Sequence, residues 1–222
     1  MTKIQEAVII EPVSDHRASI IWLHGLGADG HDFEPVVPEL HLPGQLGLRF
    51  IFPHAPVRPV TINGGMAMRA WYDVRNMDLR RDEDADSIAE SANIIYELID
   101  IEISSGIPPE KILIAGFSQG GAIALHAGLR FHSRLAGILA LSTYLPLPDK
   151  LPDEASEPNR SIPVMMCHGK FDPVIPEIAG MQSRDLLQQM GYKLEWHSYP
   201  MQHAVCMEEI QDISRWLLDI FK

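Results

Sequence analysis

The motif GFSQG at residues 116–120 places a serine between an apolar run and a stretch of small residues. The run at 111–115 is typical of a buried strand, and the stretch at 120–131 is typical of a helix packed against a sheet. In a sharp strand-to-helix turn of this type, small flanking residues prevent steric overlap, and the serine hydroxyl is exposed at the sheet edge. The helix begins at the serine, so its free N–H groups face any negative charge that develops there. Ser118 is therefore a candidate nucleophile for acyl transfer, and the alternative is a capping serine at a glycine-rich helix start.

A serine hydroxyl is a weak nucleophile, so this chemistry needs a general base that is oriented by an acid. The expected chain order on this type of turn is serine, acid, histidine. We predict His203 as the base, because it lies in a loop between the last predicted strand and the last predicted helix. Of the other histidines after Ser118, His126 falls in a predicted helix and His132 at its end. His197 falls in a predicted strand, and His168 precedes the candidate acid. The alternative for His203 is a loop histidine without a catalytic role.

Asp172 is the candidate acid. It follows the apolar run at 163–167 and the turn at Gly169, which places it at the same carboxyl edge of the sheet as Ser118. There it would accept the second N–H of the imidazole and fix its tautomer. Asp149 and Asp153 compete with it, but both lie in a proline-rich segment with no strand to aim them. Capping of the following helix is the alternative role for Asp172.

Two backbone N–H groups are expected to form the oxyanion hole. One is that of Gln119, which directly follows the nucleophile, and we assign the other to Leu26 in the HGLG turn at 24–27. The same turn is also explained by glycines that permit a tight bend. His24 and His168 suggest a metal, but the chain has no H-E-x-x-H, no ligand-spaced cluster and no C-x-x-C. We therefore expect no metal and no cofactor.

The elements that must position these residues alternate along the chain. The predicted strands are 19–23, 49–52, 111–115, 137–141, 163–167 and 193–197. The predicted helices are 88–99, with a capping box at Ser87–Glu90 and an end before Gly106, and 120–131, 177–190 and 207–221. Apolar strands separated by helices predict an α/β fold, a mostly parallel central sheet with helices on both faces. We predict a single domain over 1–222, with a long loop at 54–80 and an exposed loop at 144–162.

Composition excludes several classes of function. Asp and Glu number 30 against 18 Lys and Arg, so the net charge of −12 offers no basic surface for nucleic acid or anionic lipid. The two cysteines, Cys167 and Cys206, cannot form a disulfide framework. The first residues lack the apolar core of a signal peptide, and no apolar run reaches the roughly 18 residues of a membrane span. These features predict a soluble, cytoplasmic protein without a transmembrane segment.

Seven segments now carry a resemblance to a known family. They are WLHGLGADGHDF (22–33), FIFPHAPVRPVTINGG (50–65), WYDV (71–74), ILIAGFSQGGAIALH (112–126), LSTYLP (141–146), HGKFDPVIP (168–176) and YPMQHAVCMEEIQDI (199–213). In this order they resemble the small carboxylesterase/acyl-protein thioesterase branch of the α/β-hydrolase superfamily, the phospholipase/carboxylesterase family. Their combination covers most of the chain and is far more specific than the serine motif alone.

The resemblance implies an α/β-hydrolase fold and cleavage of carboxylic esters or thioesters through an acyl-enzyme. It implies a triad of Ser118, Asp172 and His203, with Leu26 and Gln119 in the oxyanion hole. Relatives act on acyl-protein thioesters, lysophospholipids and short-chain esters, and they are often homodimers. The chain departs from the family pattern at two positions: Gln202 stands where many relatives carry Gly, and Pro173 where a second acid is frequent.

The substrate pocket is predicted from the segment 57–77. Met66 and Met68 would provide an adaptable apolar lining together with Trp71, and we add Val174 beside the acid to this set. The alternative is that these residues fill the core beneath a long loop. A chain of 222 residues leaves no room for a large cap domain, so we expect an open site.

Three other functions remain as alternatives to an esterase or thioesterase. One is a hydrolase-fold protein that binds a ligand without turnover, although a binder has no chemical need for a nucleophile, a base and an oxyanion loop. The others are a serine peptidase and a lipase.

Overall fold

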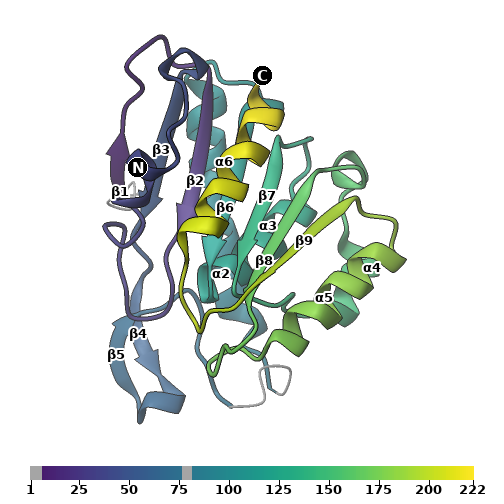
Figure 1. Ribbon diagram of the computed structural model, residues 1–222. Helices are drawn as coiled ribbons and strands as arrows, with labels where there is room; N and C mark the ends of the chain where they lie inside the picture. The colour runs from purple at the N-terminus through teal and green to yellow at the C-terminus, as the bar shows by residue number, and fades with distance from the viewer. Residues whose placement is uncertain (1–6, 77–81) are drawn as a thin grey trace.

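The computed structural model describes residues 7–76 and 82–222. Its centre is a seven-stranded sheet in the order β1-β3-β2-β6-β7-β8-β9 (Figure 1), in which β1 runs antiparallel to β3 and the other neighbouring strands run parallel. The strands are β1 (Ala7–Ile10), β2 (Ala18–Leu23), β3 (Leu48–Pro53), β6 (Ile112–Phe117), β7 (Gly137–Leu141), β8 (Val164–Gly169) and β9 (Leu194–Tyr199). All six strands predicted from apolar runs are present. The short antiparallel strand β1 was not predicted.

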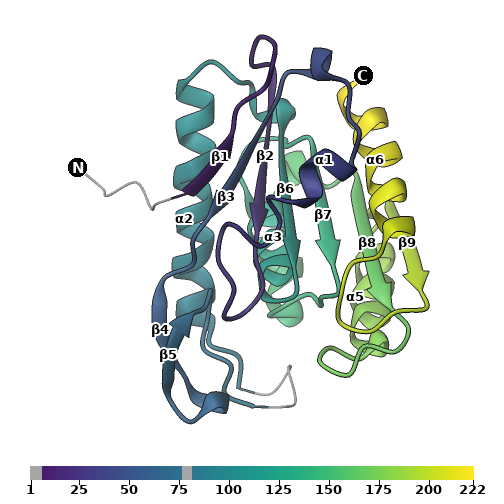
Figure 2. The same ribbon diagram turned by 60° about the vertical axis from the view of Figure 1, so that its left-hand side comes forward.

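The helices cover both faces of this sheet. They are α1 (Val36–Glu39), α2 (Ala85–Ser104), α3 (Gln119–Arg130), α4 (Leu151–Glu154), α5 (Glu177–Gln189) and α6 (Met207–Phe221). Figure 2 shows the sheet between α2 on one side and α6 on the other. None of the helices in the described ranges is both long and apolar enough to cross a membrane.

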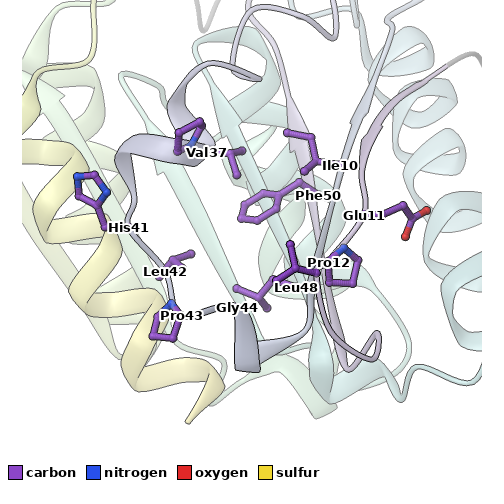
Figure 3. Close-up of a pocket in the computed structure, with 12 residues that line it drawn as sticks. Ile10, Glu11, Pro12, Val37, His41, Leu42, Pro43, Gly44, Leu48 and Phe50 are labelled. Carbon is purple, nitrogen blue, oxygen red and sulfur yellow. The ribbon is translucent and has the colours of Figure 1, made fainter.

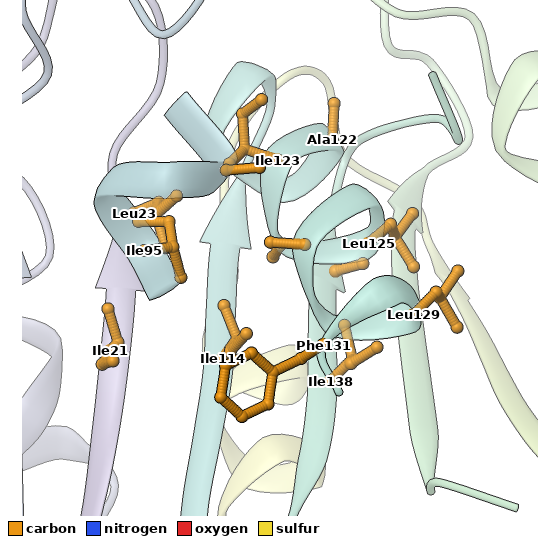
Figure 4. Close-up of a cluster of buried hydrophobic side chains, with 14 of the residues drawn as sticks. Ile21, Leu23, Ile95, Ile114, Ala122, Ile123, Leu125, Leu129, Phe131 and Ile138 are labelled. Carbon is orange, nitrogen blue, oxygen red and sulfur yellow. The ribbon is translucent and has the colours of Figure 1, made fainter. Parts of the chain in front are cut away.

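Alternation along the strands divides the buried side chains into two layers. In β2, Ile21 and Leu23 belong to one cluster, whereas Ile20 and Trp22 belong to the other. This follows because successive side chains of a strand point to opposite faces. The first cluster includes side chains of α2, α3 and α5, and Figure 4 shows the part of it between α2, α3 and the strands. The second cluster includes side chains of α6. The sheet is therefore buried on both faces, and its strand ends are left to carry the polar chemistry.

The start of α2 differs from the sequence prediction. The capping box expected at Ser87 does not cap this helix, since α2 already begins at Ala85. Asp84 is the N-cap residue, and its carboxylate accepts a hydrogen bond from the Ser87 amide. An aspartate three residues earlier takes the role, so Ser87 falls inside the first turn.

The two long connections are more ordered than predicted. Within 54–80, residues Val57–Val60 (β4) and Met66–Arg69 (β5) form an antiparallel hairpin that projects beyond the carboxyl ends of the central strands (Figure 1). The end of that segment, from residue 77, lies outside the described residues.

The segment 144–162 is not an exposed loop. Several of its side chains are buried in the first cluster, among them Leu145, Leu151 and Ile162. The Asn159 amide group accepts a hydrogen bond from the Leu135 amide and donates to two backbone carbonyls. A proline-rich composition indicated the absence of regular strands, but it did not indicate exposure.

Candidate active site

Ser118 lies at the turn between β6 and α3 in an unusual backbone conformation, with φ 55° and ψ −121°. The Ser118 amide donates to the carbonyl of Leu141 over 2.8 Å. A Cβ at Gly116 would lie 2.3 Å from the carbonyl oxygen of Gly120, and one at Gly120 would lie 2.4 Å from that of Leu23. These contacts exclude any side chain at both glycines, which is the steric requirement that the motif predicts.

A second hydrogen bond holds the same turn from its other side. The Thr143 hydroxyl donates to the carbonyl of Ser118 over 2.7 Å. Gly121 makes room for it, because a Cβ there would lie 2.8 Å from Thr143 Cγ2. The last residue of β7 and the segment that follows it therefore fix both the amide and the carbonyl of the serine. This stabilises a backbone conformation that is otherwise strained.

The structure brings Ser118, His203 and Asp172 together. Ser118 Oγ lies 2.9 Å from His203 Nε2, and His203 Nδ1 lies 2.7 Å from Asp172 Oδ2. The other carboxylate oxygen, Asp172 Oδ1, accepts hydrogen bonds from the amides of Val174 and Ile175 at 2.8 and 2.9 Å. Because Nδ1 faces a carboxylate, it carries the proton, and Nε2 is left to accept from the serine hydroxyl. This arrangement can remove a proton from Ser118.

The loop that carries Leu26 is held by a buried neutral imidazole. His24 Nδ1 donates to the Gly25 carbonyl over 2.7 Å, while His24 Nε2 accepts from the Ala55 amide over 3.0 Å. Burial lowers the pKa of His24 to about 4, so the imidazole stays uncharged at neutral pH. One donor and one acceptor nitrogen are both satisfied, and this fixes the loop after β2 in one position.

Gln119 is the first residue of α3, where helical N–H groups have no partner within the helix. Both polar atoms of its side chain already have partners: Oε1 accepts from the Trp71 amide and Nε2 donates to the Tyr72 carbonyl, each over 2.7 Å. The backbone N–H is therefore what Gln119 offers to a bound group.

A cavity of about 310 Å³ opens beside Ser118. Its lining is mostly apolar and consists of Leu26, Ile62, Asn63, Tyr72, Val74, Asn76, Ser118, Gln119, Tyr144, Pro173, Val174 and Ile175. Val174 was predicted here, and both assigned oxyanion-hole residues line the same cavity as the nucleophile. Such a space suits an apolar group attached to a reacting carbonyl.

Three residues predicted for the pocket do not line it. Trp71 is fully buried, and its indole N–H donates to the His24 carbonyl over 2.9 Å. Met66 lies on β5 with 64% of its surface exposed, and the Met68 sulfur accepts from the Asn63 side chain over 3.3 Å. The alternative interpretation, in which an aromatic residue fills the core beneath the long connection, holds for Trp71.

Sequence reasoning missed most of the residues that do line the cavity, such as Tyr72 and Tyr144. Both stand in segments that carried the family resemblance, WYDV and LSTYLP. The segments marked the right places, but nothing local distinguished a lining side chain from a core one.

His168 lies in the protein interior, near the end of β8. It is fully buried, its Nε2 donates to the Ile175 carbonyl over 2.9 Å, and burial lowers its pKa. Among the residues placed by the structure, no group of three His, Cys, Asp or Glu side chains could hold a metal ion.

A second cavity, of about 200 Å³, is lined by β1, β3 and the loop that follows α1 (Figure 3). It contains none of the candidate catalytic residues, and apolar side chains such as Ile10, Leu42 and Phe50 form much of its wall. The cavity beside Ser118 is therefore the candidate substrate site.

Comparison with known proteins agrees with the fold and the motifs. A family model described as phospholipase/carboxylesterase matches residues 4–220. The chain is 42% identical over 221 residues to acyl-protein thioesterase 1 of Neurospora crassa, covering 96% of this chain and 90% of the relative. It is 40% identical over 230 residues to acyl-protein thioesterase 1 of Cryptococcus neoformans, covering 96% of each.

Solved structures give the same result. Acyl-protein thioesterase 2 of Zea mays superposes with a TM-score of 0.86 at 31% identity, covering 98% of this chain and all of that one. This confirms the predicted α/β-hydrolase fold with a mostly parallel sheet. Because the family model spans nearly the whole sequence, the chain belongs to the phospholipase/carboxylesterase family.

Proposed function

We propose that Ser118, His203 and Asp172 form the catalytic triad of this enzyme, with Leu26 and Gln119 as its oxyanion hole. Membership of the family makes the chain a serine hydrolase of esters and thioesters. One observation carries the residue assignment: hydrogen bonds run without a break from Ser118 Oγ through His203 to Asp172, beside a cavity that Leu26 and Gln119 also line.

In the first half of the reaction, Ser118 Oγ attacks the acyl carbon while His203 Nε2 takes the hydroxyl proton. The carbonyl oxygen becomes negative and accepts hydrogen bonds from the backbone N–H groups of Leu26 and Gln119. His203 then donates its proton to the departing sulfur or oxygen as that bond breaks. Asp172 stabilises the positive imidazolium between these two steps.

In the second half, a water molecule takes the place of the leaving group. His203 removes a proton from this water as it attacks the acyl-enzyme carbon, and the bond to Ser118 Oγ breaks. The proton returns to the serine, and the carboxylic acid product leaves.

We further propose that the acyl group is carried on a protein through a thioester. The named relatives are acyl-protein thioesterases. The apolar lining of the cavity suits an acyl chain, and Val174 at its edge is 56% exposed, so the cavity opens to solvent. An open mouth is needed when the chain is presented by a bulky molecule.

A comparison of kcat/KM values tests the substrate class. The substrates are an acylated peptide thioester, a lysophospholipid and p-nitrophenyl esters, each measured on the wild type and on Ser118→Ala. We expect the thioester to give the highest kcat/KM, and the variant to lose about 10⁴-fold or more on every substrate. A preference for the lysophospholipid or for a peptide bond would favour a lipase or a peptidase instead.

Labelling with a fluorophosphonate tests the nucleophile independently of the substrate. We expect an adduct on Ser118 of the folded wild type and none on Ser118→Ala. Folded protein that forms no adduct would instead favour a non-catalytic binding protein.

Two expectations about the cellular form stay predictions. We expect a cytoplasmic enzyme and a homodimer, and both rest on likeness to relatives and on composition. Light scattering of the purified chain measures the oligomeric state, and a dimer mass is the expected result.

A further inference from the structure

One side of the cavity beside Ser118 is formed by two tyrosines that are far apart in the sequence. Tyr72 is 4% exposed and Tyr144 is 3% exposed, and their hydroxyl oxygens lie 3.0 Å apart. Both rings line the cavity together with Ser118. The pair therefore puts a hydrogen-bonded polar boundary on a mostly apolar space.

Both tyrosines are tied directly to the nucleophile turn. The Tyr72 carbonyl accepts from the side chain of Gln119 over 2.7 Å. Tyr144 follows Thr143, whose hydroxyl donates to the Ser118 carbonyl over 2.7 Å. Short covalent and hydrogen-bonded connections thus link the tyrosine pair to the Ser118 turn. They keep the pair at a fixed distance from the Ser118 hydroxyl.

A different environment lies behind the pair. The same two tyrosines also line a much smaller recess of about 10 Å³, whose other walls include Asp73, Arg75 and Glu83. Arg75 forms an ion pair of 3.1 Å with Asp84, and the Glu83 carboxylate accepts from the Leu147 amide over 3.0 Å. Tyr72 and Tyr144 line both spaces, as do Val74 and Asn76. The two tyrosines are therefore part of the partition between a mostly apolar cavity and a charged recess.

The two phenols stay neutral. Burial raises the pKa of Tyr144 to about 12, and burial raises the pKa of Tyr72 well above its ordinary value. The hydrogen bond between the hydroxyls is therefore kept at neutral pH.

We propose that the Tyr72–Tyr144 pair is the end wall of the acyl pocket and sets the longest acyl chain that the enzyme accepts efficiently. Each methylene buried between Ser118 and the pair gains hydrophobic stabilisation. A longer chain must either separate two hydrogen-bonded hydroxyls and enter a charged recess, or leave its end in water. This inference rests on the proposed function, because it assigns the cavity to the acyl side of the substrate.

A series of p-nitrophenyl esters from acetyl to palmitoyl tests the wall, because the leaving group stays constant. In the wild type, kcat/KM should rise with chain length to a maximum and then fall. Tyr144→Leu removes the hydroxyl and part of the ring, so its maximum should lie at least about two carbons further along. We also compare one ratio in both proteins: kcat/KM for the palmitoyl ester divided by kcat/KM for the ester that the wild type prefers. This ratio should be about tenfold higher in Tyr144→Leu than in the wild type. Tyr72→Leu is a second variant with the same expectation, in case one of them folds poorly.

Tyr192→Leu is the matched control. Tyr192 is also 4% exposed, but it lines neither space, so its variant should keep the wild-type maximum. If both wall variants lower kcat/KM equally for all chain lengths, the tyrosines only support the fold and the inference is wrong. A series of alkyl acetates varies the alcohol instead of the acyl group. If the wall variants shift the preferred chain length only in that series, the cavity holds the alcohol, and the inference is likewise wrong. In either case, fluorophosphonate labelling and hydrolysis by the wild type would persist, whereas their loss would reject the proposed function itself.

Discussion

Gly169 lies directly against the backbone carbonyl of Gln202, so that a Cβ on the glycine would be 2.3 Å from that oxygen. Gly169 ends β8, three residues before Asp172, and Gln202 immediately precedes His203. The loop of the acid and the loop of the base therefore touch, with no side chain between them. This close approach allows the carboxylate to reach the imidazole at 2.7 Å.

Gly169→Ala should therefore separate the acid from the base. The added methyl group would also lie 2.6 Å from the Met201 carbonyl, so one loop must move. A displacement of about 1 Å at a catalytic group can cost about 100-fold in rate, and we expect a loss of that order in kcat with a smaller change in KM. Phe171→Ala is the control, because Phe171 lies in the same loop but is 65% exposed. Wild-type kcat and Tm in Gly169→Ala would contradict the importance of this contact.

Asp172→Asn should act through the tautomer of His203. Two backbone amides donate to Oδ1, so the amide oxygen of an asparagine would take that place and its NH2 group would face His203 Nδ1. Two donors cannot share a hydrogen bond, so the imidazole would move its proton to Nε2 and lose the ability to accept from Ser118. A loss of about 10⁴-fold in kcat is the expected scale for a wrong tautomer in a serine triad.

The exposed Asp153 provides the comparison for this variant, because it was a competing acid in the sequence. Asp153→Asn should keep wild-type kcat on the same ester. If Asp172→Asn loses less than about tenfold, then Asp172 does not orient the base.

Local patterns were sufficient for much of the fold. The strand predicted at 137–141 and the helix predicted at 207–221 agree with β7 and α6 residue for residue. Both are continuous or periodic apolar segments with clear ends, and burial of such segments determines the element almost alone. The approach of Ser118, His203 and Asp172 could also be predicted, because parallel strands bring their carboxyl ends to one edge.

The rest depends on contacts between distant parts of the chain. Tyr72 and Tyr144 are separated by 72 residues, and neither segment contains a signal that the two hydroxyls meet. Trp71 and Val174 are both apolar residues near the site, but only packing decides that the first is core and the second is lining. Side-chain composition predicted an apolar pocket without predicting which residues form it.

His24→Phe should impair catalysis through the oxyanion loop. Phenylalanine keeps an aromatic ring, but it removes the side-chain hydrogen bond to the Gly25 carbonyl and the acceptor of the Ala55 amide. We expect about 1–3 kcal/mol of lost stability and a roughly tenfold lower kcat, because the Leu26 N–H is no longer held in place. His126→Phe is the control, since His126 is also buried but its Nδ1 has no hydrogen-bond partner within residues 7–76 and 82–222. Equal effects of both substitutions on kcat would contradict a role for His24 in the site.

The stability advantage of Glu209→Gln over the wild type should grow as the pH rises. Glu209 is fully buried, and burial raises the pKa of its carboxyl group from 4.5 to about 8. Its Oε2 accepts from the Cys206 amide, and its Oε1 has no partner among the described residues. The negative charge of Asp212 raises the same pKa. Between the two pKa values, the folded chain holds a proton that the unfolded chain has released. The free energy of unfolding of the wild type therefore falls by about 1.4 kcal/mol per pH unit in this window through Glu209 alone.

Glutamine resembles the protonated acid and does not titrate, so it removes this dependence. Its carbonyl oxygen can still accept from the Cys206 amide in the capping box of α6. The Tm difference between Glu209→Gln and the wild type should thus grow from about pH 5 to about pH 8 and then level off. Glu208→Gln, at an exposed position on the same helix, should show no such trend. A difference independent of pH would mean that Glu209 is ionised in the folded protein, and the helix that follows His203 would then begin on a buried charge.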